Sequence, residues 1–364
     1  MNTPPERPKA SPRERPSLDD RVPALLTRAR ALLKLPGGPP GELGRSEIAK
    51  AADAVSALHD GLVGARSLAH PSTYDSPRHL GAYLLWWWPQ TYAKTRAALQ
   101  LAPMPARPRI LDLGAGPAPA AIASLDALGG EALAVDVSAL ALTEARALGS
   151  LQTAQLDLAT KDLPAGPYQL TIAANVLCEL PQARRAALVR QLSGVVVIIE
   201  PALRETGRAL LELRDGLLAS GEWKALAPCL TQKPCPALVS PKDWCTAERR
   251  WTPPRHVVQL AEATGLRADE LLSFAPLVLA REAAAPDPSL WRVVGVPSPE
   301  SGKSRFFICN DQGRVPLVRL HKHATPANEG FASLERGDRV RLTGIEPRGD
   351  GLRVLPESVV EKIQ

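Results

Sequence analysis

Residues 109–117 read Arg-Ile-Leu-Asp-Leu-Gly-Ala-Gly-Pro, an apolar segment that runs into two closely spaced glycines. This pattern is typical of a buried strand that ends in a tight turn, where glycine lets the backbone pass close to a ligand. A second apolar run, Ala132–Val137, places Asp136 about 20 residues after the glycines, where a carboxylate can bind a ribose diol. The two segments together predict a pocket for a nucleoside-type ligand.

Outward from this turn, residues 108 to about 225 alternate between predicted strands and predicted helices, which indicates a parallel sheet covered on both faces. The predicted strands are Arg109–Leu113, Ala132–Val137, Leu151–Asp157, Gln169–Ala174 and Gly194–Ile199. Leu271–Leu279, later in the chain, is a further candidate strand of the same sheet. The predicted helices are Ala118–Leu128, Ala139–Leu148, Ala183–Leu192, Thr206–Ala219 and His256–Gly265. Ligands of such sheets bind at the carboxyl ends of the strands, where five candidate residues fall: Gly114, Gly116, Asp136, Asp157 and Asn175.

The residues of the glycine turn discriminate between two candidate cofactors, a dinucleotide and S-adenosylmethionine. A dinucleotide needs G-x-G-x-x-G, but position 119 is proline, which argues against a pyrophosphate cradle. The pattern Leu-Asp-Leu-Gly-Ala-Gly instead resembles the first motif of class I S-adenosylmethionine-dependent methyltransferases. That resemblance implies S-adenosylmethionine as cofactor and the following cofactor-binding residues: Asp112, Gly114, Ala115 and Gly116 at the methionine end, Asp136 at the ribose, Asp157 near the adenine and Asn175 beside the reacting centre. An ordinary turn with no ligand is the alternative.

The signature of base-amino methyltransferases, Asp or Asn followed by Pro-Pro and an aromatic residue, is absent after Asn175. Cys178 lacks the preceding proline that usually accompanies the nucleophile of cytosine-C5 enzymes, so it is interpreted as a buried small apolar residue. The catalytic residues therefore stay unknown, and the chain could bind the cofactor without turnover.

The residues before this domain have a different composition and periodicity. Residues 1–20 are predicted to be a disordered charged tail, and 21–105 a helical region with helices at Ala24–Leu33, Ser46–Ala65 and Ser76–Leu101, the last kinked or broken before Pro89. Trp86, Trp87 and Trp88 are expected to pack this region onto the next domain, with stacking on a base or cofactor as the alternative.

The methyltransferase-like domain is predicted to cover 106–285, with a cysteine-rich insertion at 228–254. Residues 286–364 contain short β segments and a hairpin-turn signal, Asn310-Asp-Gln-Gly313, and they predict a small barrel of the OB type. The predicted strands are Trp291–Val296, Arg305–Cys309, Val315–Leu320, Asp338–Leu342 and Leu352–Leu355.

Composition narrows the possible partners and compartment. The chain has 364 residues and a net charge of +6, which favours a polyanion such as RNA over a neutral partner. The sequence has no run near the roughly 18 apolar residues of a membrane helix and no signal-peptide pattern, so a cytoplasmic protein without a membrane partner is expected. The five cysteines are then poor candidates for structural disulfides.

Three cysteines, Cys229, Cys235 and Cys245, lie in the proline-rich insertion with spacing C-x5-C-x9-C, and Cys309 lies far downstream. Zinc usually takes tighter pairs, whereas wider thiolate spacing suits a larger [4Fe–4S] cluster; isolated free cysteines are the alternative. Nearby cations are expected to offset the charge of an anionic cluster: Lys233, Lys242, Arg249 and Arg250.

Residues 75 to about 360 resemble, as a set, the small-ribosomal-subunit methyltransferase-like family of Rsm-twenty-two type, also called methyltransferase-like protein seventeen, and suggest a bacterial member. The resemblance rests on the cysteine set and on Pro77–Tyr83, Pro89–Tyr92, Ile110–Pro117, Asn175–Pro181 and Glu200–Pro201, although family members commonly have glycine where this chain has Ala202. It implies a methyltransferase-like fold, association with the assembling small subunit, and Cys229, Cys235, Cys245 and Cys309 as ligands of a [4Fe–4S] cluster.

The sequence thus predicts a small-subunit (16S-type) rRNA-binding factor for ribosome assembly or translation that is monomeric away from the ribosome. Phosphate contacts are expected from basic barrel residues: Arg314, Arg319, Lys322, Arg339 and Arg341. An active S-adenosylmethionine-dependent rRNA methyltransferase is one alternative, and a small-molecule methyltransferase is another.

Overall fold

The computed structural model describes residues 15–62, 68, 73–268, 270–282, 284 and 287–363. Most of the predicted tail, residues 1–14, lies outside these ranges. The remainder of the tail enters α1 (Leu18–Leu33), which begins six residues before the predicted helix because Ser17 and Asp20 form a capping box there. In the described part of the chain, none of the helices combines the length and apolar character needed to span a bilayer.

Three helices form the N-terminal region: α1, α2 (Arg45–Leu62) and α3 (Pro77–Leu99), with a short 3₁₀ turn η1 (Thr73–Asp75) before α3. The expected break before Pro89 is wrong, because α3 continues through this residue. Proline removes one backbone hydrogen bond from a helix, but α3 is buried along most of its length, and its packing against α1, α2 and α8 outweighs that loss.

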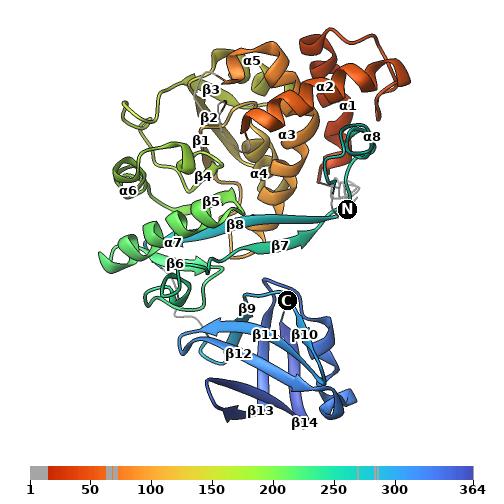
Figure 1. The fold of residues 1–364 in the computed structure, drawn as a ribbon. Helices are drawn as coiled ribbons and strands as arrows, with labels where there is room; N and C mark the ends of the chain where they lie inside the picture. Colours follow the sequence, from red (N-terminus) through yellow and green to blue (C-terminus); the bar gives the residue numbers. More distant parts are fainter. Residues whose placement is uncertain are drawn as a thin grey trace, which may run out of the picture.

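The central sheet has strand order β3-β2-β1-β4-β5-β8-β6, with β7 on the end of β8 (Figure 1). Its strands are β1 (Arg109–Leu113), β2 (Glu131–Asp136), β3 (Gln152–Gln155), β4 (Leu170–Ala174), β5 (Val195–Pro201), β6 (Lys224–Ala227), β7 (Ala247–Arg250) and β8 (Leu271–Ala280). The first five are parallel, and β8 runs antiparallel to its neighbours β5 and β6. This arrangement confirms the predicted class I methyltransferase-like fold.

Helices cover both faces of the sheet because successive strand residues point to opposite sides. Leu111 and Leu113 pack with α6 (Gln182–Arg190) and α7 (Arg204–Ala219), together with the short η2 (Leu177–Glu179). Ile110 and Ala132 pack with α3, α4 (Pro119–Leu128) and α5 (Ala139–Leu148) on the other side. The cysteine-rich insertion contains the short η3 (Pro236–Leu238) and β7, and α8 (Arg255–Thr264) follows it.

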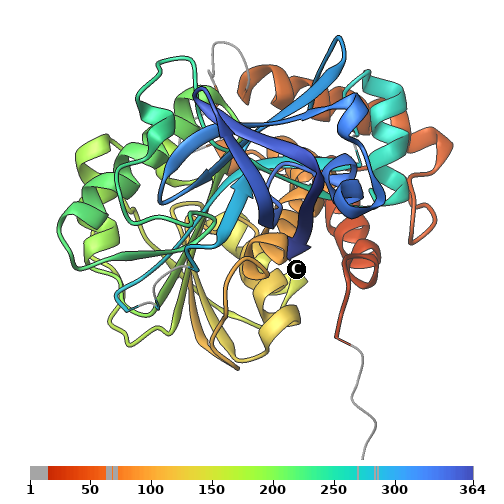
Figure 2. The ribbon, with the colours of Figure 1, turned by 90° about the horizontal axis from the view of Figure 1, so that it is seen from below.

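The C-terminal residues form a closed barrel. Its strands are β9 (Leu290–Val293), β11 (Lys303–Asn310), β12 (Gly313–Leu320), β13 (Arg339–Arg348) and β14 (Gly351–Ile363), with β10 (Ser298–Glu300) on the outside and η4 (His321–His323) and η5 (Pro326–Ser333) after β12. Strand β9 pairs with both β11 and β13, which closes the ring, and β12 runs parallel to β14 (Figure 2). The predicted OB-type barrel and the hairpin turn at 310–313 are both confirmed.

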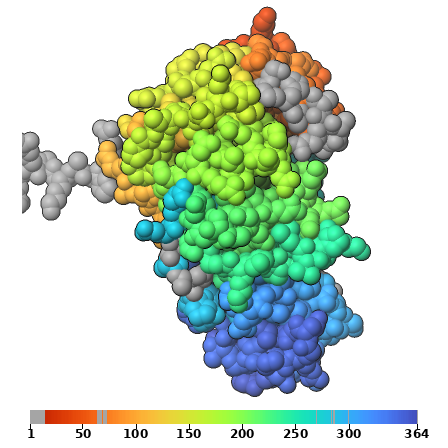
Figure 3. Space-filling view, turned by 90° about the vertical axis from the view of Figure 1, so that its left-hand side faces the viewer, coloured from red at the N-terminus to blue at the C-terminus, as the bar shows by residue number. Residues whose placement is uncertain are grey.

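The barrel lies at one end of an elongated molecule, and the segment that contains the cysteine-rich insertion lies between it and the rest of the sheet domain (Figure 3). Polar contacts attach the barrel to this segment. Arg250 pairs with Glu335 at 2.9 Å, Arg336 with Glu248 at 3.1 Å, and Thr231 donates to Asp311 at 2.7 Å.

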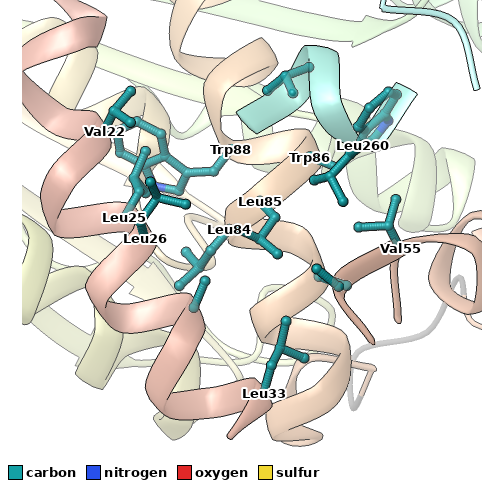
Figure 4. Packing of buried hydrophobic residues seen from close by; sticks show 14 of the residues in the cluster. Val22, Leu25, Leu26, Leu33, Val55, Leu84, Leu85, Trp86, Trp88 and Leu260 are labelled. Atoms are coloured by element: carbon teal, nitrogen blue, oxygen red, sulfur yellow. The ribbon is translucent and has the colours of Figure 1, made fainter. Parts of the chain in front are cut away.

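Two of the three consecutive tryptophans are core residues, as the packing interpretation predicts. Trp88 is fully buried against α1, Trp86 points toward Leu260 of α8, and Figure 4 shows both side chains among apolar neighbours. Trp88 also donates from Nε1 to the carbonyl of Pro117 at 3.1 Å, which ties the helical region to the glycine turn.

Candidate functional site

The glycine turn joins β1 to α4 in a backbone conformation that favours glycine. Gly114 has a φ of +60° and Gly116 a φ of +55°. A Cβ atom at Gly114 would lie 2.2 Å from Cγ2 of Val176, whereas at Gly116 it would meet no atom within 4 Å. The turn therefore packs tightly against the segment after β4 on one side and leaves space at Gly116.

Asp136 lies at the carboxyl end of β2, directly beside this turn. One carboxylate oxygen accepts a hydrogen bond from the amide of Gly116 at 2.8 Å, and the other accepts from the amide of Ser138 at 2.8 Å. Burial raises the pKa of Asp136, and these amide bonds oppose the rise. The structure thus brings Asp136 together with the glycines, and each oxygen keeps a further lone pair for a hydroxyl donor.

Asp112 lies beneath the turn and is almost completely buried. Oδ2 accepts from the amide of Ala121 in the first turn of α4 at 2.9 Å, and Oδ1 has no hydrogen-bond partner among the described residues. Burial raises the pKa of Asp112 from 3.8 to about 7. A buried carboxylate with an unpaired oxygen is costly, so this position favours a cationic ligand.

We expect Asp112→Asn to stabilise the ligand-free protein above neutral pH. Between pH 3.8 and about 7 the unfolded chain releases the Asp112 proton while the folded chain keeps it, so the wild type loses stability as the pH rises. The shift corresponds to roughly 4 kcal/mol at most. Thermal unfolding of both proteins should show a higher Tm for the variant at pH 8 and convergence near pH 4. An equal difference at both pH values would contradict this origin of the effect.

Asp157 and Asn175 occupy the ends of β3 and β4. Both carboxylate oxygens of Asp157 accept bonds within its own turn, from the amide of Ala159 and the hydroxyl of Thr160, each at 2.9 Å. Asn175 has a φ of +59°, a strained backbone conformation that often accompanies a functional site. Asn175 therefore shows a feature that suits a site, and Asp157, like Asp136, is held in place by one hydrogen bond to each oxygen.

Three further titratable residues belong to the surroundings of the glycine turn and Asp136. Tyr74 and Tyr83 come from η1 and α3, and their ring centroids lie 5.0 Å apart. Burial is the main cause of the raised pKa of each phenol, and the negative charge of Asp136 raises both pKa values further. Glu200 at the end of β5 accepts from the amide of Leu177 at 3.0 Å, and burial raises its pKa to about 7. The two tyrosines were missed because they precede the sheet domain in sequence, although Tyr83 lies in one of the quoted motifs.

The second candidate site is a small cavity between the insertion and the barrel. Its walls contain Cys229, Cys235, Cys245 and Cys309, so the structure brings the four predicted cysteines to one place. Cys178 is elsewhere, beside the carbonyl of Asn175. Within the described ranges, no three His, Cys, Asp or Glu side chains converge closely enough to hold a single metal ion.

Arginines, rather than the cations expected from the sequence, line this cavity: Arg214, Arg292 and Arg314. Of the expected cations, Lys233 pairs with Asp311 at 2.7 Å and Arg250 pairs with Glu335. Burial raises the pKa of Cys235 and of Cys309 to about 12, and the neighbouring Cys229 adds to the rise. The arginines oppose it, because a cation favours the thiolate.

Several basic barrel residues expected to contact phosphate are engaged within the protein. Arg314 pairs with Asp243, Arg341 with Asp287 at 3.3 Å, and Arg319 donates to the carbonyl of Asn328 at 3.1 Å while its guanidinium lies over Phe331. Lys322 is exposed. The outward residues of β11 place Lys303, Arg305 and Phe307 on one face, which the sequence-based expectation overlooked. Both cations there pair with Glu300, Lys303 at 3.0 Å and Arg305 at 3.2 Å.

Comparison with known proteins gives one family match: the profile described as mitochondrial small ribosomal subunit Rsm22 matches residues 77–340. No curated protein matches the chain. Among solved structures, an S-adenosylmethionine-dependent methyltransferase from Mesorhizobium loti is similar at 26% identity and a TM-score of 0.26, over 31% of this chain and 57% of that one. A TehB-like methyltransferase from Corynebacterium glutamicum is similar at 17% identity and a TM-score of 0.34, over 53% of this chain and 88% of that one.

Proposed function

Because the chain belongs to the Rsm22 family of the mitochondrial small ribosomal subunit, we propose that it binds small-subunit rRNA as an assembly or translation factor. The observation that carries the proposal is the extent of the family match, which includes the sheet domain, the cysteine-rich insertion and much of the barrel. Cytoplasmic location and a monomeric state away from the ribosome stay predictions.

The barrel supports an RNA-binding role. OB barrels bind oligonucleotides on the face made by their second and third strands, which here are β11 and β12. On that face the guanidinium carbon of Arg305 lies 5.5 Å from the ring centroid of Phe307. Arginine planes and aromatic rings can both stack on unpaired bases. The exposed Lys322 adds charge for phosphates.

We expect binding to small-subunit RNA to weaken steeply with added salt, because each neutralised phosphate releases counterions. Replacing both Arg305 and Lys322 by alanine should reduce the slope of log K against log salt by up to about 2. Filter binding or fluorescence anisotropy over a salt series measures it, with the exposed Lys50→Ala on α2 as a matched control. Salt-insensitive binding, or no binding to the isolated RNA or the subunit, would overturn the proposal.

We also assign the glycine-turn site to S-adenosylmethionine. The unpaired Oδ1 of Asp112 suits the ammonium of the methionine end, Asp136 suits the ribose hydroxyls, and the space at Gly116 suits a ligand that passes close to the backbone. When bound, this cofactor supplies an electrophilic methyl group. The strained Asn175 and the buried Glu200 at the neighbouring strand ends favour an active rRNA methyltransferase as the second candidate function.

Isothermal calorimetry with S-adenosylmethionine should detect binding to the wild type and a loss of affinity on the order of tenfold or more in Asp136→Ala, since hydrogen bonds to a charged group contribute about 1.5–3 kcal/mol each. The exposed Asp162→Ala is the matched control. Transfer of a labelled methyl to small-subunit particles then separates enzyme from scaffold. If calorimetry detects no binding to the wild type, only the RNA-binding function remains.

For the cavity between the insertion and the barrel, we propose a [4Fe–4S] cluster held by Cys229, Cys235, Cys245 and Cys309. Four thiols line this one cavity, which is the number of cysteine ligands that such a cluster takes. Such a group supplies rigid cross-links between the insertion and the barrel, and a one-electron couple. Anaerobic purification followed by iron, sulfide and zinc analysis tests it. Stoichiometric zinc without a brown chromophore would exclude the cluster.

A further inference from the structure

Cys309 lies between two arginines of the barrel. In the register of the strands it faces Arg292 of β9 on one side and Arg314 of β12 on the other, and paired residues of an antiparallel ladder project to the same face. Both arginines line the cysteine cavity, together with Arg214 of α7. The cavity therefore carries three guanidinium groups at its walls.

Two of these groups have a carboxylate partner within the protein. Arg314 pairs with Asp243, and Arg214 pairs with Asp215 while donating to the carbonyls of Thr231 and Lys233. These contacts also hold the insertion in place, so Arg214 has a structural role whatever occupies the cavity.

Arg292 differs from the other two, because no ion pair with a carboxylate involves it among the described residues. It is 3% exposed and donates from Nη1 to Sγ of Cys245 at 2.9 Å and from Nη2 to the carbonyl of Thr246 at 3.1 Å. Its Nε has no hydrogen-bond partner in the described ranges. A buried guanidinium without a counter-ion costs several kcal/mol. The thiol that Arg292 contacts, Cys245, belongs to the cysteine set.

We infer that Arg292 is the counter-charge of an anionic group held by the four cysteines and that it sets the reduction potential of that group. The inference rests on the proposed cluster. A cluster with four thiolate ligands is anionic, and one-electron reduction adds a further negative charge. A buried cation within hydrogen-bonding distance of a ligand sulfur stabilises the reduced form more than the oxidised form, and it raises the potential.

The test is a redox titration with dithionite, followed by electron paramagnetic resonance, on the full chain loaded anaerobically with iron and sulfide. In Arg292→Met, the ratio of reduced to oxidised cluster at a fixed potential should fall at least tenfold, which equals 59 mV for a one-electron couple. Arg292→Lys keeps the positive charge, so its ratio of reduced to oxidised cluster should stay close to that of the wild type. Arg348→Met, an exposed arginine of the barrel, is the matched control.

The outcomes separate this inference from the proposed cluster. A fully loaded Arg292→Met protein with the wild-type titration would overturn the counter-charge role while leaving the cluster intact. If Arg292→Met fails to load, Arg292→Lys decides: a loaded Lys variant near the wild-type potential supports the role, and an empty one assigns Arg292 to folding alone. A wild type without iron and sulfide overturns both the cluster and the inference.

Discussion

Replacement of Cys245 by serine should abolish loading of the proposed iron–sulfur cluster and destabilise the junction between the two domains. Cys245 accepts a hydrogen bond from the buried Arg292, so its loss leaves that guanidinium without its sulfur partner as well as removing a ligand. The insertion has little regular structure of its own, with only η3 and the short β7. Sites of this kind couple ligand binding to folding, so the loop should lose order together with the cluster.

The iron content per chain is expected to fall at least about tenfold, since even the loss of an outer-shell partner costs a metal site roughly 10–100-fold in affinity. Iron and sulfide analysis, the visible absorption of the cluster and limited proteolysis near residues 229–245 are the measurements. Cys178→Ser is a matched control, because Cys178 lies at the other site, beside Asn175. A Cys178→Ser protein that loses iron as Cys245→Ser does would contradict the assignment of ligands.

Replacement of Trp88 by alanine should lower the free energy of unfolding by about 3–5 kcal/mol. The indole is fully buried, stacks on Tyr92 with ring centroids 5.4 Å apart, and donates to the carbonyl of Pro117. The substitution therefore leaves a cavity, an unpaired carbonyl and a loosened glycine turn. Chemical denaturation measured by circular dichroism gives the change.

Trp87→Ala is the comparison for this experiment. Trp87 is only partly buried and lies parallel to Tyr83, with ring centroids 6.4 Å apart. Its removal should cost clearly less stability, because less apolar area leaves the core. Equal losses of stability from the two substitutions would contradict the view that deeper burial and the bond to Pro117 make Trp88 the more important residue.

Local sequence patterns accounted for most of the sheet domain. The strand Arg109–Leu113 and the helix Ala139–Leu148 have the predicted bounds, because short apolar runs bounded by glycine, proline or a serine cap leave few alternatives. The helix break expected at Pro89 is wrong because local sequence does not decide this position. The cost of proline is a local effect, and burial of α3 among three other helices outweighs it.

In the candidate sites, too, some features follow from local sequence and others only from the tertiary structure. The sequence by itself determined the glycine turn, the acidic residues at the strand ends and the four cysteines, because each depends on residue type at a fixed spacing. Only the tertiary structure decided that the rings of Tyr74 and Tyr83 contact each other, that Asp157 accepts hydrogen bonds within its own turn, and that Arg292 lies beside Cys245 and Cys309. These contacts join segments far apart in the chain, or depend on hydrogen bonds that form only in the folded protein, and no local pattern encodes them.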